Sequence, residues 1–263
     1  MSSGIAYLDG VDWEDLGIEL LAIPNLWSAP TSSIARITAP FYHGARFTHN
    51  ATVAGVRQWQ LQAYNRETTD ALVETAMQTV KDAVTDRRSK LSFANAPNRG
   101  FYGVCEAFNA DIHALGVPGW SDVGMVFTCD DPFSVDDALT IVSGYTSERV
   151  AVQVGSGPTY PYIIVTGAAT TPTLTARDYT GKSLGTMTTT SLDGNDCWII
   201  ETVNGGMAWR SNDGVIASDM ANLTAGYTFP VFSPRDGNRA LSLWPTLETS
   251  AGTIEVRYAR RWR

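Results

Sequence analysis

The sequence predicts a mainly β protein, in which an N-terminal β domain with one helix is followed by a β-sandwich. Two observations support this class. Charged residues make up only 17% of the 263 residues, and the 23 Gly and 12 Pro are spread along the chain, as in loop-rich β proteins. Apolar residues alternate with polar ones in several short runs, which is the period of a half-buried strand, and one stretch alone has helical spacing.

The boundary between the two parts lies where a strand pattern ends in a turn. Residues 123–129 alternate between apolar and smaller or polar side chains, and the run stops at a turn rich in aspartate. We therefore expect domains at residues 1–133 and 134–263, and protease cleavage within residues 134–147. The hinge between them is expected at Asp130, Asp131, Pro132 and Phe133.

Residues 68–88 form the stretch with the helical pattern. Thr68 or Thr69 can cap its start, and basic residues gather at its end, which matches the direction of the helix dipole. Its apolar residues lie three or four positions apart and so share one face that can cover a sheet. The predicted apolar face consists of Leu72, Val73, Ala76, Met77, Val80, Ala83 and Val84.

Strands are expected before this helix. In residues 56–64 polar and apolar side chains alternate, so Trp59 and Leu61 share one face of a strand. Residues 36–47 have the composition of further strands or of a long hairpin, with Pro40 at an edge or a bulge.

After the helix the pattern is one of short strands separated by turns. Strands are expected at residues 91–93 and 101–108, with a turn at 95–100 between them, and residues 193–196 (DGND) predict a hairpin turn. Glycines separate the strands of the second half at intervals typical of a sandwich. The strands expected there are residues 151–154, 162–166, 173–178, 197–203, 207–210, 240–243 and 253–258.

The charge is divided unevenly along the chain. Residues 1–150 hold 10 Lys and Arg against 18 Asp and Glu, a balance of −8, whereas residues 151–263 hold 9 of each. An acidic chain is a poor candidate for gripping nucleic acid, because phosphate neutralisation needs a basic face. The basic tail is expected to be a solvated terminal strand that meets acidic neighbours. It consists of Arg257, Arg260, Arg261 and Arg263.

The cysteine count and the hydropathy of the sequence indicate the compartment in which the chain folds. The three cysteines are odd in number and widely spaced, which argues against a disulfide framework and indicates synthesis in a reducing cytoplasm. The first residues lack the pattern of a secretory signal, and no window has the length and hydropathy of a membrane span. We expect no membrane segment.

No motif supports catalysis, a metal or a cofactor. The sequence lacks zinc-ligand spacings, and residues 155–157 (GSG) lack the flanks of a nucleophile elbow or a phosphate loop, so they predict a turn. Asp130, Asp131, Asp136 and Asp137 could pair for glycoside hydrolysis or hold calcium, but aspartate beside Pro and Ser is ordinary turn chemistry, which we favour. We therefore expect no enzyme activity.

Tryptophans in the second half leave a sugar-binding alternative open. Trp198 lies within an apolar run and is expected in the core. Trp209 and Trp244 also lie in this half, and Trp244 is the residue we would assign to a glycan contact.

Several segments, in the right order, resemble the distal tail (Dit) proteins of phages with long non-contractile tails. The carboxyl-terminal part of that family has a Y-P-x-I-x-I-x-G strand, an F-P-x-L-x-P-G-x-N segment and a final strand, and its N-terminal domain ends in F-x-x-x-D-P-[YF]. Asp236 departs from the second pattern, because the family runs Pro-Gly-x-Asn there. The matching segments are residues 127–133 (FTCDDPF), 159–167 (TYPYIIVTG), 172–175 (PTLT), 181–184 (GKSL), 193–195 (DGN), 229–238 (FPVFSPRDGN) and 252–258 (GTIEVRY).

The resemblance implies a structural role at the tail tip of a virion. Such proteins form a homohexameric ring from a belt domain, here residues 1–133, while galectin-like sandwiches, here residues 134–263, project outward. The implied partners are the tail tube protein, the tape measure protein, the tail hub protein and a receptor-binding protein, and viral DNA passes the lumen without specific binding. The alternative is a carbohydrate-binding virion protein that attaches to host glycans.

Overall fold

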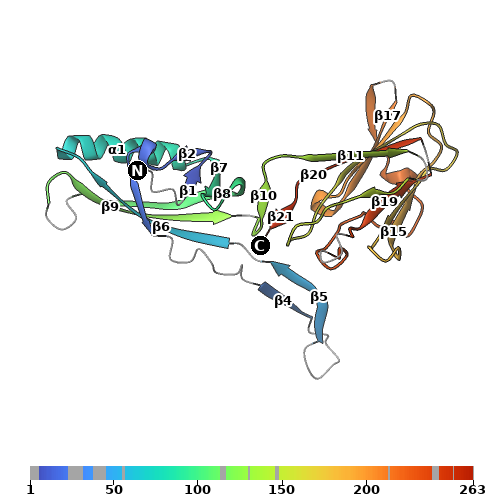
Figure 1. Cartoon of the computed structure of the whole chain (residues 1–263), viewed down its shortest axis with the longest axis horizontal. Coiled ribbons are helices and arrows are strands. Elements are labelled where there is room, and N and C mark those ends of the chain that lie inside the picture. The colour runs from blue at the N-terminus through green and yellow to red at the C-terminus, as the bar shows by residue number, and fades with distance from the viewer. Residues whose placement is uncertain are drawn as a thin grey trace. The chain divides into compact units, whose positions relative to one another are not determined.

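The computed structural model of the chain describes residues 6–22, 32–37, 46–54, 57–112, 117–129, 131–145, 148–212, 214–238, 243–250 and 252–262. The chain divides into two compact units, one ending at Ser134 and the other running from Val135 to Trp262. Strands dominate both units, and α1 is the one α-helix of the described part (Figure 1). The predicted mainly β class is confirmed.

The first unit contains one large sheet, one helix and a separate strand pair. Its sheet has the strand order β2-β1-β7-β8-β9-β6-β3, with antiparallel neighbours throughout. The elements are β1 (Ala6–Leu8), β2 (Val11–Asp12), the 3-10 turn η1 (Glu14–Leu16), β3 (Glu19–Ala22), β4 (Ser32–Ile37), β5 (Arg46–Ala54), β6 (Arg57–Arg66), α1 (Asp70–Val84), β7 (Arg88–Phe93), β8 (Ala96–Ile112) and β9 (Trp120–Cys129).

The core of this unit lies between α1 and one face of the sheet (Figure 1). Trp59 and Leu61 of β6 are buried on that face, as their alternation predicts, and Phe127 of β9 is buried beside them. The same alternation leaves the other face of β6 polar, with Gln58, Gln60 and Gln62 exposed. Burial of large apolar side chains along these strands therefore fixes their register and holds the helix.

The helix begins as predicted and ends earlier. Thr69 is the N-cap, and its Oγ1 accepts a hydrogen bond from the N–H of Leu72 at 3.4 Å. The predicted end at Arg88 is wrong, because Thr85 is already extended and Arg88 opens β7. Leu72 is 48% exposed, so its place in the predicted apolar face is also wrong. It precedes Val73 by about 100° around the helix and points away from the sheet. The buried face consists of Val73, Met77, Val80 and Val84.

The turn predicted at residues 95–100 is much shorter in the structure. β8 begins at Ala96, which pairs with Phe93, so Ala94 and Asn95 alone make the turn between β7 and β8. Turn-forming residues follow at 97–100, but they lie in the first part of a long strand, where tertiary pairing overrides their local preference.

β4 and β5 pair with each other as an antiparallel hairpin, in agreement with the hairpin expected near residues 36–47. Pro40, predicted at an edge or bulge, lies outside the described residues.

The second unit contains two sheets. Their strand orders are β11-β20-β13-β16-β17-β18 and β12-β19-β14-β15. The elements are β10 (Ser134–Asp136), β11 (Thr140–Tyr145), β12 (Val150–Ala151), β13 (Tyr162–Thr166), β14 (Thr173–Arg177), β15 (Ser183–Thr188), β16 (Cys197–Glu201), η3 (Val203–Gly205), β17 (Met207–Asn212), β18 (Val215–Ser218), η4 (Met220–Asn222), β19 (Thr246–Thr249), β20 (Thr253–Tyr258) and β21 (Arg261–Trp262).

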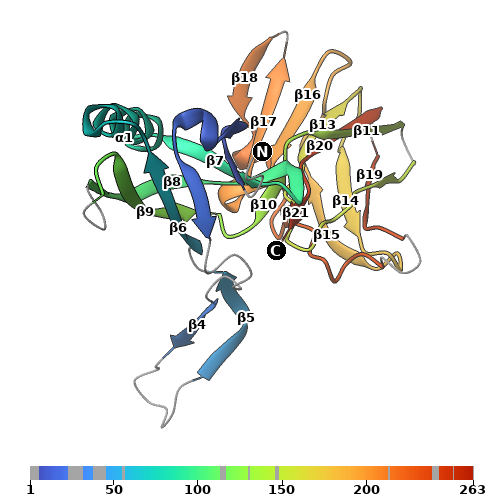
Figure 2. The ribbon, with the colours of Figure 1, turned by 60° about the vertical axis from the view of Figure 1, so that its left-hand side comes forward.

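The two sheets pack against each other around one apolar core (Figure 2). Ile163 and Trp198 from the larger sheet and Leu174 and Leu247 from the smaller one are all at most 1% exposed. This arrangement is a β-sandwich, built from strands whose alternate residues face inward. The expected burial of Trp198 is confirmed.

Most strands predicted for this half are present. The strand expected at residues 151–154 is wrong after Ala151, because residues 152–154 are not a strand, although Val152 and Val154 are buried. Of residues 240–243, the first three lie outside the described part, so the strand expected there stays a prediction. The Asp193–Asp196 turn forms, since the N–H of Asp196 donates to the carbonyl oxygen of Asp193 at 3.0 Å. It is not a hairpin, however, because β15 and β16 on its two sides belong to different sheets.

Candidate functional sites

The predicted hinge follows β9 directly. The predicted strand at residues 123–129 is confirmed within β9, where its apolar side chains are buried. The carboxylate of Asp131 accepts a hydrogen bond from the N–H of Phe133 at 3.0 Å, which is a local turn, and Phe133 is itself buried. Asp130 lies outside the described residues. The hinge at these residues stays a prediction. Exposed residues begin later, at 137–139, within the stretch where protease cleavage is expected.

Two of the four aspartates considered for catalysis, Asp131 and Asp136, hold local structure. Asp136 accepts a hydrogen bond from Nε of Arg260 at 2.6 Å and another from Nε1 of Trp262 at 2.7 Å. Among the described residues, no group of three or more His, Cys, Asp or Glu side chains could hold a metal ion. The basic tail therefore meets an acidic neighbour, as expected.

Trp244 lies against the core of the second unit. It is partly buried and packs on the apolar cluster, and its ring is close enough to Gly237 that a Cβ there would lie 3.1 Å from it. Part of the indole stays accessible, and its glycan contact remains a prediction.

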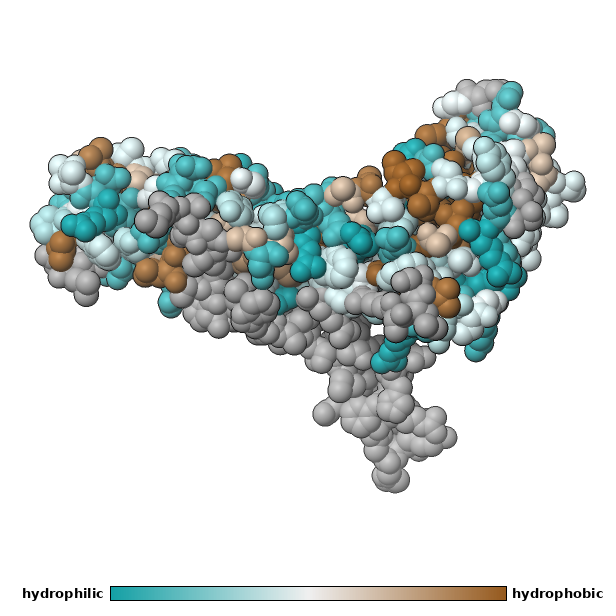
Figure 3. All heavy atoms as spheres, viewed as in Figure 1, coloured by the Kyte–Doolittle hydropathy of each residue, from teal (hydrophilic) through white to brown (hydrophobic). Residues whose placement is uncertain are grey.

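The outer face of the larger sheet carries apolar side chains that the sequence analysis did not single out. Register places Ile164 beside Ile199 and Ile199 beside Trp209, so these half-buried residues form one row across β13, β16 and β17. Ile141 of β11 and Ile216 of β18, the two edge strands of this sheet, are 57% and 65% exposed. Apolar residues gather on this unit in the space-filling view (Figure 3), a feature found at protein-interaction surfaces.

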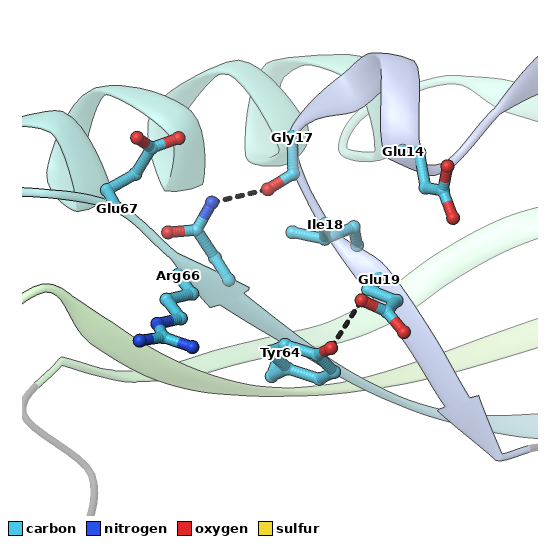
Figure 4. Close-up of a pocket in the computed structure, with 8 residues that line it drawn as sticks. Glu14, Gly17, Ile18, Glu19, Tyr64, Arg66 and Glu67 are labelled. Atoms are coloured by element: carbon cyan, nitrogen blue, oxygen red, sulfur yellow. Dashed lines mark hydrogen bonds between the residues drawn. The ribbon is translucent and has the colours of Figure 1, made fainter. Parts of the chain in front are cut away.

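A hollow in the first unit lies where β3 separates from β6 (Figure 4). The last pair between these strands is Glu19 with Tyr64. The chain enters β3 from η1 through the left-handed Gly17, so the residues before Glu19 do not pair with β6. The space has a volume of about 320 Å³. Its lining consists of Glu14, Gly17, Ile18, Glu19, Tyr64, Asn65, Arg66 and Glu67.

Two side chains on β6 define this hollow. The hydroxyl of Tyr64 donates to Oε2 of Glu19, and that hydrogen bond, followed by burial, raises the pKa of Tyr64. The ring of Tyr64 stacks on Trp120, with centroids 4.8 Å apart and planes 6° from parallel. Asn65 is only 3% exposed, and its Nδ2 donates to the carbonyl oxygen of Gly17 (Figure 4). This pair is not among the residues predicted from the sequence, although Asn65 is a polar residue at a buried position of an alternating strand.

Comparison with solved structures finds the same fold in phage proteins. The crystal structure of SPP1 Dit, described as a paradigm of the hub adsorption apparatus in phages that infect Gram-positive bacteria, superposes with a TM-score of 0.71 at 14% identity. The match covers 98% of this chain and 99% of that one. A chain of the phage p2 baseplate in its activated conformation with Sr matches with a TM-score of 0.50 at 8% identity, over 97% of both chains.

These matches define the class of fold. The chain has the fold of a phage distal tail protein over its full length, as the resemblance in sequence implies. No family model matches the sequence, and no curated protein does. Within the part of the chain that the structure describes, no helix has the length and hydropathy needed to cross a membrane.

Proposed function

We propose that this chain is a structural, non-enzymatic component of the tail tip of a phage with a long non-contractile tail. The observation that carries the proposal is the full-length match to SPP1 Dit, which includes both units and not a single common domain. In this role the first unit closes into a homohexameric ring that continues the tail tube. The second unit, a galectin-like sandwich, projects outward and can carry receptor-binding parts.

The charge distribution supports the ring assignment. The excess of acidic residues lies entirely in residues 1–150, with 18 Asp and Glu against 10 Lys and Arg. A ring built from this half has a negative lumen, which repels the phosphates of DNA and lets DNA pass without sticking. A basic lumen would instead retain DNA, because each neutralised phosphate releases counterions and adds affinity.

Ring closure requires a particular kind of contact. One face of each subunit must bind a different face of the next, since a head-to-tail contact closes into a ring when its rotation divides a full turn. The partners along the tail axis are then the tube protein on one side and the hub protein on the other, with the tape measure protein inside during assembly.

The experiment that tests this role is reconstitution with the tail proteins of the same phage. The purified chain is mixed with its tail tube protein or its hub protein, and the products are separated by size and imaged by electron microscopy. We expect the chain to form a ring stacked on each partner. A chain that stays separate from both partners at micromolar concentrations would overturn the proposal.

A further inference from the structure

The strand β18, at one edge of the larger sheet, is exposed on both of its faces. All four of its residues are exposed, and Val215 and Ile216 are 70% and 65% exposed. Successive residues of a strand point to opposite faces, so each face of β18 presents a large apolar side chain to solvent. Within the described part of the chain, β17 is the one element with which β18 has an extended contact, and the two strands extend from the rest of the sandwich (Figure 2).

The other edge strands of the sandwich are covered. β11 and β12, one edge of each sheet, contact each other. β15 accepts hydrogen bonds from the segment 224–228, in which the N–H of Thr224 donates to the carbonyl oxygen of Thr188 at 2.9 Å. Natural proteins also protect an edge with a charge, a proline or a bulge, because an open edge is a template for pairing with another strand. β18 has no charged residue and no proline, and its register against β17 is regular.

The sequence of β18 is complementary to itself. In an antiparallel pair, residues directly opposite each other lie on the same face of the sheet. A pair centred on Ile216 places Ile216 opposite its copy and Val215 opposite Ala217, so apolar side chains meet on both faces and no like charges are opposed. The acidic excess of the chain lies in residues 1–150, whereas residues 151–263 hold 9 basic and 9 acidic residues. Two second units therefore meet without a net charge of the same sign.

We propose that β18 binds the β18 of a second copy of this chain in an antiparallel pair, so that the two larger sheets join into one. Two four-residue strands cover less than the roughly 1,200 Å² of a stable protein interface, so the contact is weak between free chains. It gains strength where other contacts hold copies close together. This two-fold contact differs from the head-to-tail contact of a ring, so the inference stands independently of the proposed function.

The test is disulfide cross-linking in the full chain, read on a denaturing gel. Cys105→Ser and Cys197→Ser first remove the two partly accessible thiols, since Cys129 is buried. Ile216→Cys is then compared with Ile141→Cys, on the opposite edge of the same sheet and 57% exposed. With the thiol oxidant diamide we expect the Ile216→Cys chain to form covalent dimers at least roughly tenfold faster, because pairing gives its two thiols a high effective concentration. Thermal unfolding checks that the variants fold, and the chain without an added cysteine gives the background.

A mixed pair of variants tests the direction and the register. Val215→Cys on a tagged chain and Ala217→Cys on an untagged chain should link to each other faster than either links to itself, because the antiparallel pair places these positions opposite each other. Faster linking of either one to itself would overturn the proposal.

Three further outcomes would overturn it as well. They are equal rates for Ile216→Cys and Ile141→Cys, preferential linking of these two variants to each other, which would indicate a head-to-tail contact, and no dimer of Ile216→Cys up to about one millimolar chain. Ring formation is observed separately by imaging, so each of these results leaves the proposed function standing.

Discussion

Arg260 and Asp136 tie the end of the second unit to its beginning. Their side chains are joined by a hydrogen-bonded ion pair with Nε and Oδ2 2.6 Å apart, although the residues are 124 positions apart in the sequence. The backbone repeats the contact, since the N–H of Asp136 donates to the carbonyl oxygen of Arg260 at 3.0 Å. Because Trp262 also donates to Asp136, one carboxylate closes the sandwich where the chain enters and leaves it.

Asp136→Asn should destabilise the second unit by about 1–3 kcal/mol, because the amide can accept from only one of the two donors and turns its own N–H toward the other. The measurement is the free energy of unfolding of the second unit in urea, with hydrogen exchange of the β13 amides as the probe. Asp193→Asn is the matched control, since Asp193 is an exposed aspartate of the same unit. A stability equal to that of Asp193→Asn would mean that the closure contributes nothing.

Gly119 lies in the turn just before β9 with a φ of +75°, and its carbonyl oxygen accepts a hydrogen bond from the N–H of Glu67 at 2.7 Å. A Cβ at this position would lie 2.2 Å from the carbonyl oxygen of Glu67. An alanine in the left-handed conformation alone costs roughly 1–2 kcal/mol, so Gly119→Ala should lower the free energy of unfolding of the first unit by more than that. Gly10→Ala has a similar φ of +86° and open space, and it supplies the control. Equal losses of stability in the two variants, measured by hydrogen exchange of β9, would contradict the close approach.

Asp219 forms the buried polar centre of the second unit. It is fully buried, accepts from Thr189 Oγ1 at 2.5 Å and from Asn222 Nδ2 at 2.8 Å, and lies 3.4 Å from Nη2 of Arg210. Asp219→Asn leaves Arg210 without its counter-charge and should cost about 3–5 kcal/mol. Loss of the exposed carboxylate that pairs with Arg257, in Glu255→Gln, should cost at most about 1 kcal/mol. Comparable unfolding midpoints for the two variants would argue against a buried network.

Glu248 makes the stability of the second unit depend on pH in the acid range. Hydrogen bonding to Arg177, and then to Arg149, holds the pKa of Glu248 below its usual value of 4.5. A carboxylate with a lowered folded pKa contributes stability that is fully present above the unfolded pKa and is lost as pH falls through the folded one. Stability should therefore drop below about pH 4.5, and Glu248→Gln should make the drop smaller. An unchanged pH slope in this variant, relative to Glu201→Gln, would be the contrary result.

Much of this fold follows from the sequence because its strands and its helix each bury one regular face. Alternation in β6 and β9 and the cap at Thr69 are local signals, and they place these elements within a few residues. β18 has no such signal, since all four of its residues are exposed. It pairs at the sheet edge through its backbone, which no side-chain pattern reports.

The hollow shows a second limit of sequence reasoning. Its lining comes from η1, β3 and the end of β6, and only the folded chain brings Glu14 and Glu67 to one place. One local signal does exist, because the alternation that buries Trp59 and Leu61 also places Asn65 on the inner face. A polar residue at a buried strand position indicates a hydrogen-bonding task before the structure is known.

The most direct test of the proposed role is the oligomeric state of the purified chain, measured by mass photometry with negative-stain imaging. The ring account predicts one closed species of six 28.5-kDa subunits, about 171 kDa, seen as a ring with a central hole. A chain that remains a 28.5-kDa monomer at high concentration, and also when mixed with tube and hub proteins, would contradict it.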